Sequence, residues 1–90
     1  MQHEEAFAQE VIKTFVRQGI IVMLPAQPEK RRVLLEYMMQ DFEPGQTYTE
    51  QEVNFKILDH YDDYAALRRE LVAQGLLIRK KGGYMAAEAQ

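Results

Sequence analysis

Residues 63–86 read DYAALRRELVAQGLLIRKKGGYMA, and this stretch decides the fold. In its first half, leucines stand four residues apart, which is the spacing of one helical face, and Gly75 is placed to end that helix. In its second half, β-favouring residues flank Gly82 and Gly83, a pair that suits the tight two-residue turn of a hairpin. The stretch therefore predicts a helix followed directly by a β-hairpin.

Two further amphipathic helices are predicted in the first half of the chain. Over residues 4–18 apolar side chains recur every three or four positions, and Gly19 is placed to end this helix. Residues 20–24 are apolar and rich in β-branched side chains, so we expect a short strand that Pro25 closes. A second helix is expected over about residues 29–41.

A capping signal precedes the third helix. Residues 43–46 form a turn signal, and residues 47–48 can add a very short strand. Thr49 and Glu52 have the spacing of a capping box, in which each side chain accepts from the backbone amide of the other residue. This helix is expected to bury Leu58 together with Val53 and Ile57. The residues expected to meet in one core are Leu34, Met38, Val53, Ile57, Leu67, Leu71 and Ile78.

This order of helix, short strand, two helices and hairpin is typical of a winged helix-turn-helix. The expected fold class is therefore α+β and mainly helical, a winged helix-turn-helix with an extra N-terminal helix and short strand. We place the N-terminal helix and strand in residues 1–24 and the winged-helix domain in residues 25–90. Ninety residues, 47% of them hydrophobic, suffice for one core.

Several linked motifs follow one another from about Leu24 onward. They are EKRRVLLEY at 29–37, FEPG at 42–45, YTEQEVN at 48–54, DYAALRRELV at 63–72, GLLIR at 75–79 and GGY at 82–84. In this order they resemble a bacterial family catalogued as domain of unknown function 2087. The resemblance implies a winged-helix-like fold that is often attached to a helix-turn-helix transcriptional regulator, and it implies no activity.

Composition argues against catalysis and against a membrane. The chain has neither serine nor cysteine, so the two commonest activated nucleophiles are absent, and His3 and His60 have no evident partners for acid–base work. We expect no enzyme and no cofactor. The longest apolar run, residues 20–24, is too short to cross a bilayer, and the acidic N-terminus is no signal peptide. A cytoplasmic protein is expected.

Charge is segregated along the chain, although the net charge is only −3. Residues 41–63 hold seven acidic side chains and one basic one, whereas residues 65–87 hold five basic side chains and one acidic one. An acidic partner such as double-stranded DNA would therefore have to meet the second block.

The candidate nucleic-acid contacts lie on the fourth helix, the hairpin and the second helix. Arg69 faces away from the core and can reach a base or phosphate, while Lys80 and Lys81 can meet phosphates at the hairpin, with Arg31 as a further contact. Arg68 falls beside the apolar stripe, so it is expected to pair with a carboxylate such as Glu52 or Asp63.

Three carboxylates oppose this interpretation: Asp62 and Asp63 at the start of the fourth helix, and Glu70 beside Arg69. A solvated structural helix and a hairpin whose charges prevent edge-to-edge aggregation remain open. The alternative function is a non-catalytic protein-interaction module whose acidic residues 41–63 face a basic partner.

Two remaining features allow alternative interpretations. Residues 59–63 contain oxygen and imidazole donors, but their spacing matches no metal motif and helix capping explains the aspartates, so no metal site is expected. The N-terminal apolar stripe can pack on its own domain or pair with a second copy, which would make a homodimer.

Overall fold

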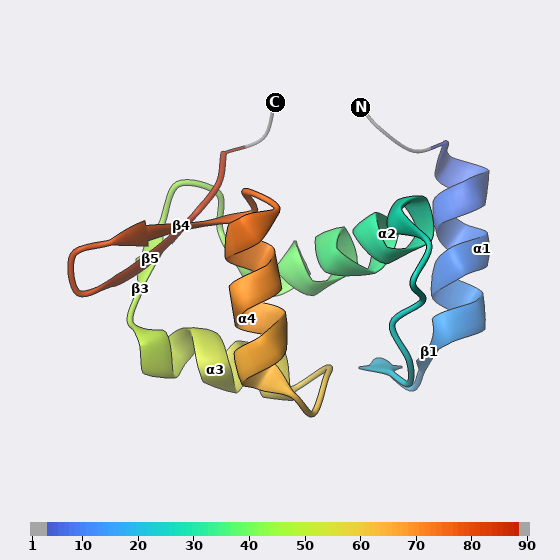
Figure 1. The fold of residues 1–90 in the computed structure, drawn as a ribbon, viewed down its shortest axis with the longest axis horizontal. Helices are drawn as coiled ribbons and strands as arrows, with labels where there is room; N and C mark the ends of the chain where they lie inside the picture. Colours follow the sequence, from blue (N-terminus) through green and yellow to red (C-terminus); the bar gives the residue numbers. More distant parts are fainter. Residues whose placement is uncertain (1–3, 89–90) are drawn as a thin grey trace.

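Four α-helices and two small antiparallel sheets make up residues 4–88, the part of the chain that this computed structural model describes (Figure 1). The predicted α+β, mainly helical class is confirmed. In chain order the elements are α1 (Glu5–Phe15), β1 (Val16–Arg17), β2 (Ile20–Ile21), α2 (Pro28–Met38), a 3₁₀ turn (Met39–Asp41), β3 (Thr47–Tyr48), α3 (Glu50–Leu58), α4 (Tyr64–Ala73), β4 (Leu77–Lys80) and β5 (Gly83–Ala86).

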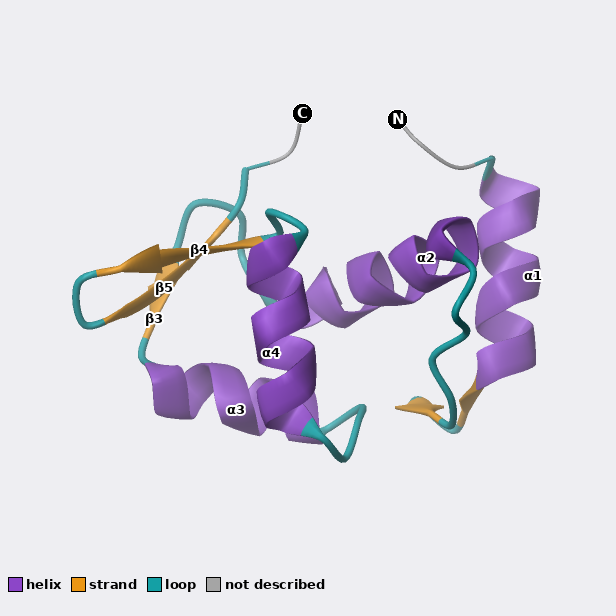
Figure 2. Cartoon of the chain, viewed as in Figure 1, coloured by secondary structure: helices purple, strands orange, loops and turns teal. Residues whose placement is uncertain are grey.

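Strands β4 and β5 form the predicted hairpin, and β3 pairs with β5, so the sheet order is β3-β5-β4 (Figure 2). Lys80 pairs with Gly83, so the turn consists of Lys81 and Gly82 and not of the two glycines as expected. The turn therefore lies one residue earlier than expected, and each residue of β4 pairs two positions earlier on β5. Leu77 is buried at 1% exposure, and the prediction that Ile78 is a core residue is wrong, because its side chain is 39% exposed.

Gly83 is the one position of this hairpin where a side chain has no room. A Cβ atom built there would lie 2.1 Å from the carbonyl oxygen of Tyr48, which belongs to the backbone of β3. Because backbone cannot swing aside as a side chain can, only glycine lets β3 and β5 approach this closely.

The N-terminal helix ends three residues earlier than expected, because the chain turns into a second hairpin. Gln18 and Gly19 both have positive φ, 55° and 83°, which is the conformation of a two-residue turn between β1 and β2. Gly19 is therefore a turn residue and not a helix terminator. The expected strand over residues 20–24 is limited to its first two residues.

Helix α1 packs across α2 (Figure 1), and its apolar stripe is covered within the chain. Val11 is buried, and the remaining stripe residues are partly buried against the same core. The stripe therefore packs on its own domain, which is the first of the two expected alternatives, and a homodimer through α1 stays a prediction. These flanking residues are Phe7, Ala8, Ile12, Phe15 and Val16.

Local capping places the central helices as predicted. The backbone amide of Glu52 donates to Thr49 Oγ1 at 3.1 Å, and the amide of Thr49 donates to Glu52 Oε1 at 2.9 Å, so the capping box is confirmed. Asp63 accepts from the amide of Ala66 and caps α4. Leu58, expected inside, is 44% exposed because it lies on the outer side of α3.

One core joins all four helices to the three-stranded sheet. Its fully covered side chains include Leu34, Met38, Val53, Ile57, Leu67, Leu71 and Leu77. Within residues 4–88, no helix has both the length and the apolar character needed to cross a membrane.

Candidate nucleic-acid interface

The outer face of helix α4 carries small side chains and one cation, Arg69. Leu67 and Leu71 are buried, so at 100° per residue Arg69 points to the opposite side of the helix. Ala65 and Ala73 flank Arg69 on this outer face. Small side chains on both sides of Arg69 let a broad partner approach the helix closely.

Glu70, which stands next to Arg69 in the sequence, is turned away toward α2. Its carboxylate accepts two hydrogen bonds from Arg31, at 2.5 and 2.8 Å, and Arg31 also donates to the carbonyl oxygens of Pro25 and Leu24. The hydrogen bonds to Glu70 raise the pKa of Arg31 above its ordinary value, more than burial lowers it. The negative charge of Glu70 is thus compensated by Arg31, and this ion pair holds α2 against α4.

Arg68 is held on the flank of α4 that faces α3. Its guanidinium donates to the side-chain oxygen of Asn54, and Glu50 lies 3.9 Å away. Arg68 thus has a carboxylate within ion-pair distance, as expected, but this partner is Glu50 and not Glu52 or Asp63. Because the closest acceptor is a neutral amide, the charge of Arg68 is not cancelled as that of Arg31 is.

Arg79 joins these arginines, although the sequence pattern did not predict it as a contact. In the observed register Arg79 lies opposite Tyr84 on the same side of the hairpin as the buried Leu77. Its guanidinium stacks over the Tyr84 ring at 5.2 Å and donates to the phenol oxygen. The signal was the alternation of the strand, which puts Arg79 on the face of Leu77, but the expectation that Ile78 is buried placed Arg79 on the wrong face.

These side chains surround a hollow of about 250 Å³ between α4 and the hairpin, here called the arginine hollow. Three guanidinium groups and one carboxylate meet in it. It is lined by Glu50, Arg68, Arg69, Val72, Arg79 and Tyr84. A concave, cationic surface of this kind attracts oxyanions.

Lys80 and Lys81 lie exposed at the tip of the hairpin, where a second hollow of about 210 Å³ separates them from Thr47, Thr49 and Glu52. Within residues 4–88, neither lysine forms an ion pair. The structure therefore places Arg69 and Arg79 in the arginine hollow and Lys80 and Lys81 around the second hollow, with Tyr84 lining both, and it leaves Arg31 apart from them in its pair with Glu70.

Acidic residues border the same surface. Asp62 and Asp63 are exposed at the first turn of α4, where Asp63 serves as the helix cap. A carboxylate at a helix N-terminus is favourable for the helix dipole but repels phosphate. Of the three opposing carboxylates, two thus remain uncompensated by an ion pair within the described residues.

The segment 59–63 has a structural role. His60 contacts the carbonyl of Gly19 through Nδ1 and the carboxylate of Asp41 through Nε2, and its own carbonyl accepts from the amide of Ile21. No group of three metal-ligating side chains occurs among residues 4–88. His3, the other histidine, lies outside the described residues.

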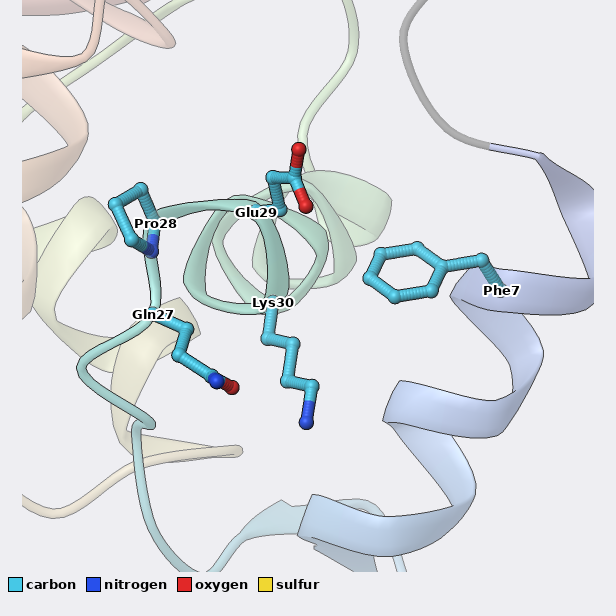
Figure 3. A pocket seen from close by; sticks show the side chains of 5 residues that line it. All are labelled: Phe7, Gln27, Pro28, Glu29 and Lys30. Carbon is cyan, nitrogen blue, oxygen red and sulfur yellow. The ribbon is translucent and has the colours of Figure 1, made fainter.

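A further hollow, of about 500 Å³, lies between α1 and the first turn of α2 (Figure 3). The ring of Phe7 projects from α1 toward α2, where Glu29 and Lys30 supply charges of both signs. Gln27 and Pro28 complete its lining. The lining thus carries one carboxylate and one ammonium group, so the charges of this hollow do not favour ions of one sign.

The fold and this surface define a small, mainly helical α+β domain with a cationic helix–hairpin face. A family model described as an uncharacterized protein conserved in bacteria, DUF2087, matches residues 20–85, so the chain belongs to this bacterial family of uncharacterised proteins. The match runs from the start of β2 into β5 and leaves α1 and β1 outside. No curated protein and no solved structure matches the chain.

Proposed function

We propose that this chain is a cytoplasmic winged helix-turn-helix protein of the transcription-regulator type that binds double-stranded DNA. In this proposal α3 and α4 are the helix-turn-helix, α4 is the recognition helix, and the β4–β5 hairpin is the wing. The element order α2-β3-α3-α4-β4-β5 and the sheet order β3-β5-β4 support the fold assignment.

The observation that carries the proposal is the grouping of cations on α4 and the wing. Arg69 and Arg79 line the arginine hollow, Lys80 and Lys81 line the second hollow, Tyr84 lines both, and none of the four cations forms an ion pair among the described residues. Phosphate contacts dominate the affinity of a protein for DNA, and they need cations that are free of internal carboxylates.

The outer face of α4 suits a major groove. Ala65 and Ala73 leave room for base edges on both sides of Arg69, and alanine methyl groups favour thymine methyls. The pairing of Glu70 with Arg31 removes one anion from this face. Asp62 and Asp63 weaken contacts near the helix start, so affinity should be modest and strongly dependent on salt.

A salt titration with fluorescently labelled genomic DNA fragments tests the proposal. With up to four phosphate contacts, the plot of log K against log salt concentration should have a slope of about −3 to −4, since each contact contributes about −0.9. Replacing Lys80 and Lys81 together by alanine should reduce the slope by nearly 2 and weaken all sequences alike. Arg69→Ala should weaken a preferred site more than random DNA, because base contacts carry the sequence information.

The matched control replaces Lys13 and Arg17 by alanine. Both are exposed, and α1 and β1 lie at the opposite end of the molecule from the wing (Figure 1), so the slope should not change. In the double variant Asp62→Asn with Asp63→Asn, the second asparagine can still cap α4, and non-specific binding should strengthen. If neither the native chain nor this variant binds DNA at low salt, the proposal is wrong.

A second candidate function rests on the outer face of α3. Phe55 is 61% exposed beside Leu58, and Asp59 flanks them, while Lys56 lies over the rings of Phe42 and Tyr48. This face suits a basic, amphipathic partner helix and corresponds to the interaction-module alternative. Titration with a synthetic leucine–lysine helical peptide tests it: Phe55→Ala should weaken binding, whereas the Lys80 and Lys81 replacements should not.

A further inference from the structure

We propose that the arginine hollow is a binding site for a phosphate group. The hollow is bounded by α4 on one side and the C-terminal hairpin on the other, and three of its six lining residues are arginines. A guanidinium group presents parallel N–H donors that match two oxygens of a phosphate. The assignment to a DNA phosphate rests on the proposed function, whereas a free phosphate ester would not need it.

Two of the arginines are fixed in place by neutral partners. Arg68, whose side chain is 14% exposed, donates to Asn54, and Arg79 donates to the Tyr84 hydroxyl while stacking on its ring. These contacts orient the guanidinium groups but leave their charge and most of their five N–H donors unused. The site is therefore pre-organised, and binding a ligand costs little for ordering these side chains.

The other described arginines of the helical core show the contrast. Arg31 meets Glu70 and Arg32 meets Glu36 at hydrogen-bonding distance, so carboxylates already cancel their charges. In the arginine hollow, by contrast, Arg68 and Arg79 each donate to a neutral side chain, Arg68 to Asn54 and Arg79 to Tyr84. The structure thus holds positive charge in the hollow that no internal anion compensates in full.

Glu50 is the single carboxylate in the hollow, and its contacts are loose. Its Oε1 accepts from the Tyr84 hydroxyl at 3.4 Å, its Oε2 lies 3.9 Å from Arg68, and its side chain is 55% exposed. Exposed ion pairs at such distances contribute little. A bound phosphate group can accept from Arg68 and Tyr84 in place of Glu50. Glu50 is then a weak internal competitor that an incoming anion displaces.

The test uses inorganic pyrophosphate and a 16-base-pair DNA duplex on the full chain. The readouts are the NMR signals of the arginine Nε–H groups and the dissociation constants. Pyrophosphate should shift the signals of Arg68, Arg69 and Arg79. Glu50→Gln, which keeps the side chain and removes the competing charge, should tighten pyrophosphate binding several-fold. Arg79→Gln should weaken it by about tenfold, as the loss of a charge-assisted contact does.

The control is Arg17→Gln, which removes one exposed charge on β1, outside the hollow. If pyrophosphate and DNA respond to Glu50→Gln and Arg79→Gln in the same way, the phosphate belongs to DNA. If only pyrophosphate binds, the ligand is a free phosphate ester, and the DNA-binding proposal fails alone. If pyrophosphate shifts no arginine signal and both variants bind DNA as Arg17→Gln does, the phosphate site is overturned while DNA binding stands.

Discussion

Nε2 of His60 lies 2.8 Å from the carboxylate of Asp41, and Nδ1 of the same ring lies 2.6 Å from the carbonyl oxygen of Gly19. Both acceptors lack a proton to donate, so the arrangement is satisfied when both ring nitrogens carry one and the imidazole is charged. The ring also meets Tyr37 edge to face, at a centroid distance of 5.5 Å. His60 thus links the N-terminal hairpin, the 3₁₀ turn and the end of α3.

The unfolding free energy should therefore depend on the charge of His60. Burial alone lowers its pKa, but hydrogen bonds to Gly19 and Asp41, with the charges of Asp41 and Asp59, raise it above the ordinary value. Because the folded pKa is raised, this stabilisation is fully present below about pH 6.5 and is lost as the pH rises through the folded pKa. Urea unfolding between about pH 5.5 and 9 should show this loss.

His60→Gln is the control for that pH dependence. Glutamine does not titrate here, so its curve should be flatter, and the difference from the native chain should shrink at alkaline pH. Asp41→Asn removes the charge but keeps an acceptor, and it should lower the pKa of His60 in an NMR titration. A native His60 that titrates at or below about 6.5 would contradict the linkage.

Gly83→Ala should destabilise the sheet. The added Cβ would overlap the Tyr48 carbonyl, and overpacking typically costs about 1–3 kcal/mol of unfolding free energy. Gly82→Asn is the matched control, because Gly82 has positive φ but open space around it, and asparagine tolerates that conformation. Equal urea midpoints for the two variants would show that β3 and β5 can separate without loss.

Leu77→Ala and Ile78→Ala compare adjacent side chains on opposite sides of one strand. Leu77 is fully covered, so its truncation should cost about 2–5 kcal/mol of unfolding free energy. Ile78 is exposed, and its truncation should change stability by less than about 1 kcal/mol. The reverse order would mean that the opposite face of β4 packs on the core.

Arg31→Gln and Arg69→Gln should separate stability from DNA affinity. Arg31→Gln leaves Glu70 without its cation and should cost about 1–3 kcal/mol of unfolding free energy. Arg69 has no partner within the described residues, so Arg69→Gln should leave the urea midpoint unchanged and weaken DNA binding. Arg31→Gln should lower the urea midpoint and, at temperatures where the variant stays folded, leave DNA binding unchanged.

Local signals account for the parts of the fold that the sequence predicts. Thr49, Asp63 and Pro28 define helix starts through contacts within three residues, so pattern reasoning finds them. The positive φ of Gln18 could not be predicted in this way, because residues other than glycine rarely adopt it. The two-glycine signal placed the hairpin turn one residue too late, and the apolar run of β4 did not show that Leu77, and not Ile78, faces the core.

The candidate site was predicted only in outline. Arg69 and the two lysines follow from helical spacing and charge, but Arg31 pairs with Glu70 across 39 positions, and His60 meets Asp41 across 19. No local pattern encodes such partners, because each depends on how the helices pack. Arg68 and Arg79 join the site for the same reason.

The contact between Gly83 and the Tyr48 carbonyl divides the C-terminal hairpin into a fixed base and an exchangeable tip. At the base, Leu77 and Ala86 are embedded in the core and allow little change. At the tip, Lys80 and Lys81 are exposed and Gly82 has open space around it. Mutation can therefore add, remove or invert charge at the tip while the rest of the domain keeps its stability. The charge of the tip can thus change during evolution without a change of fold.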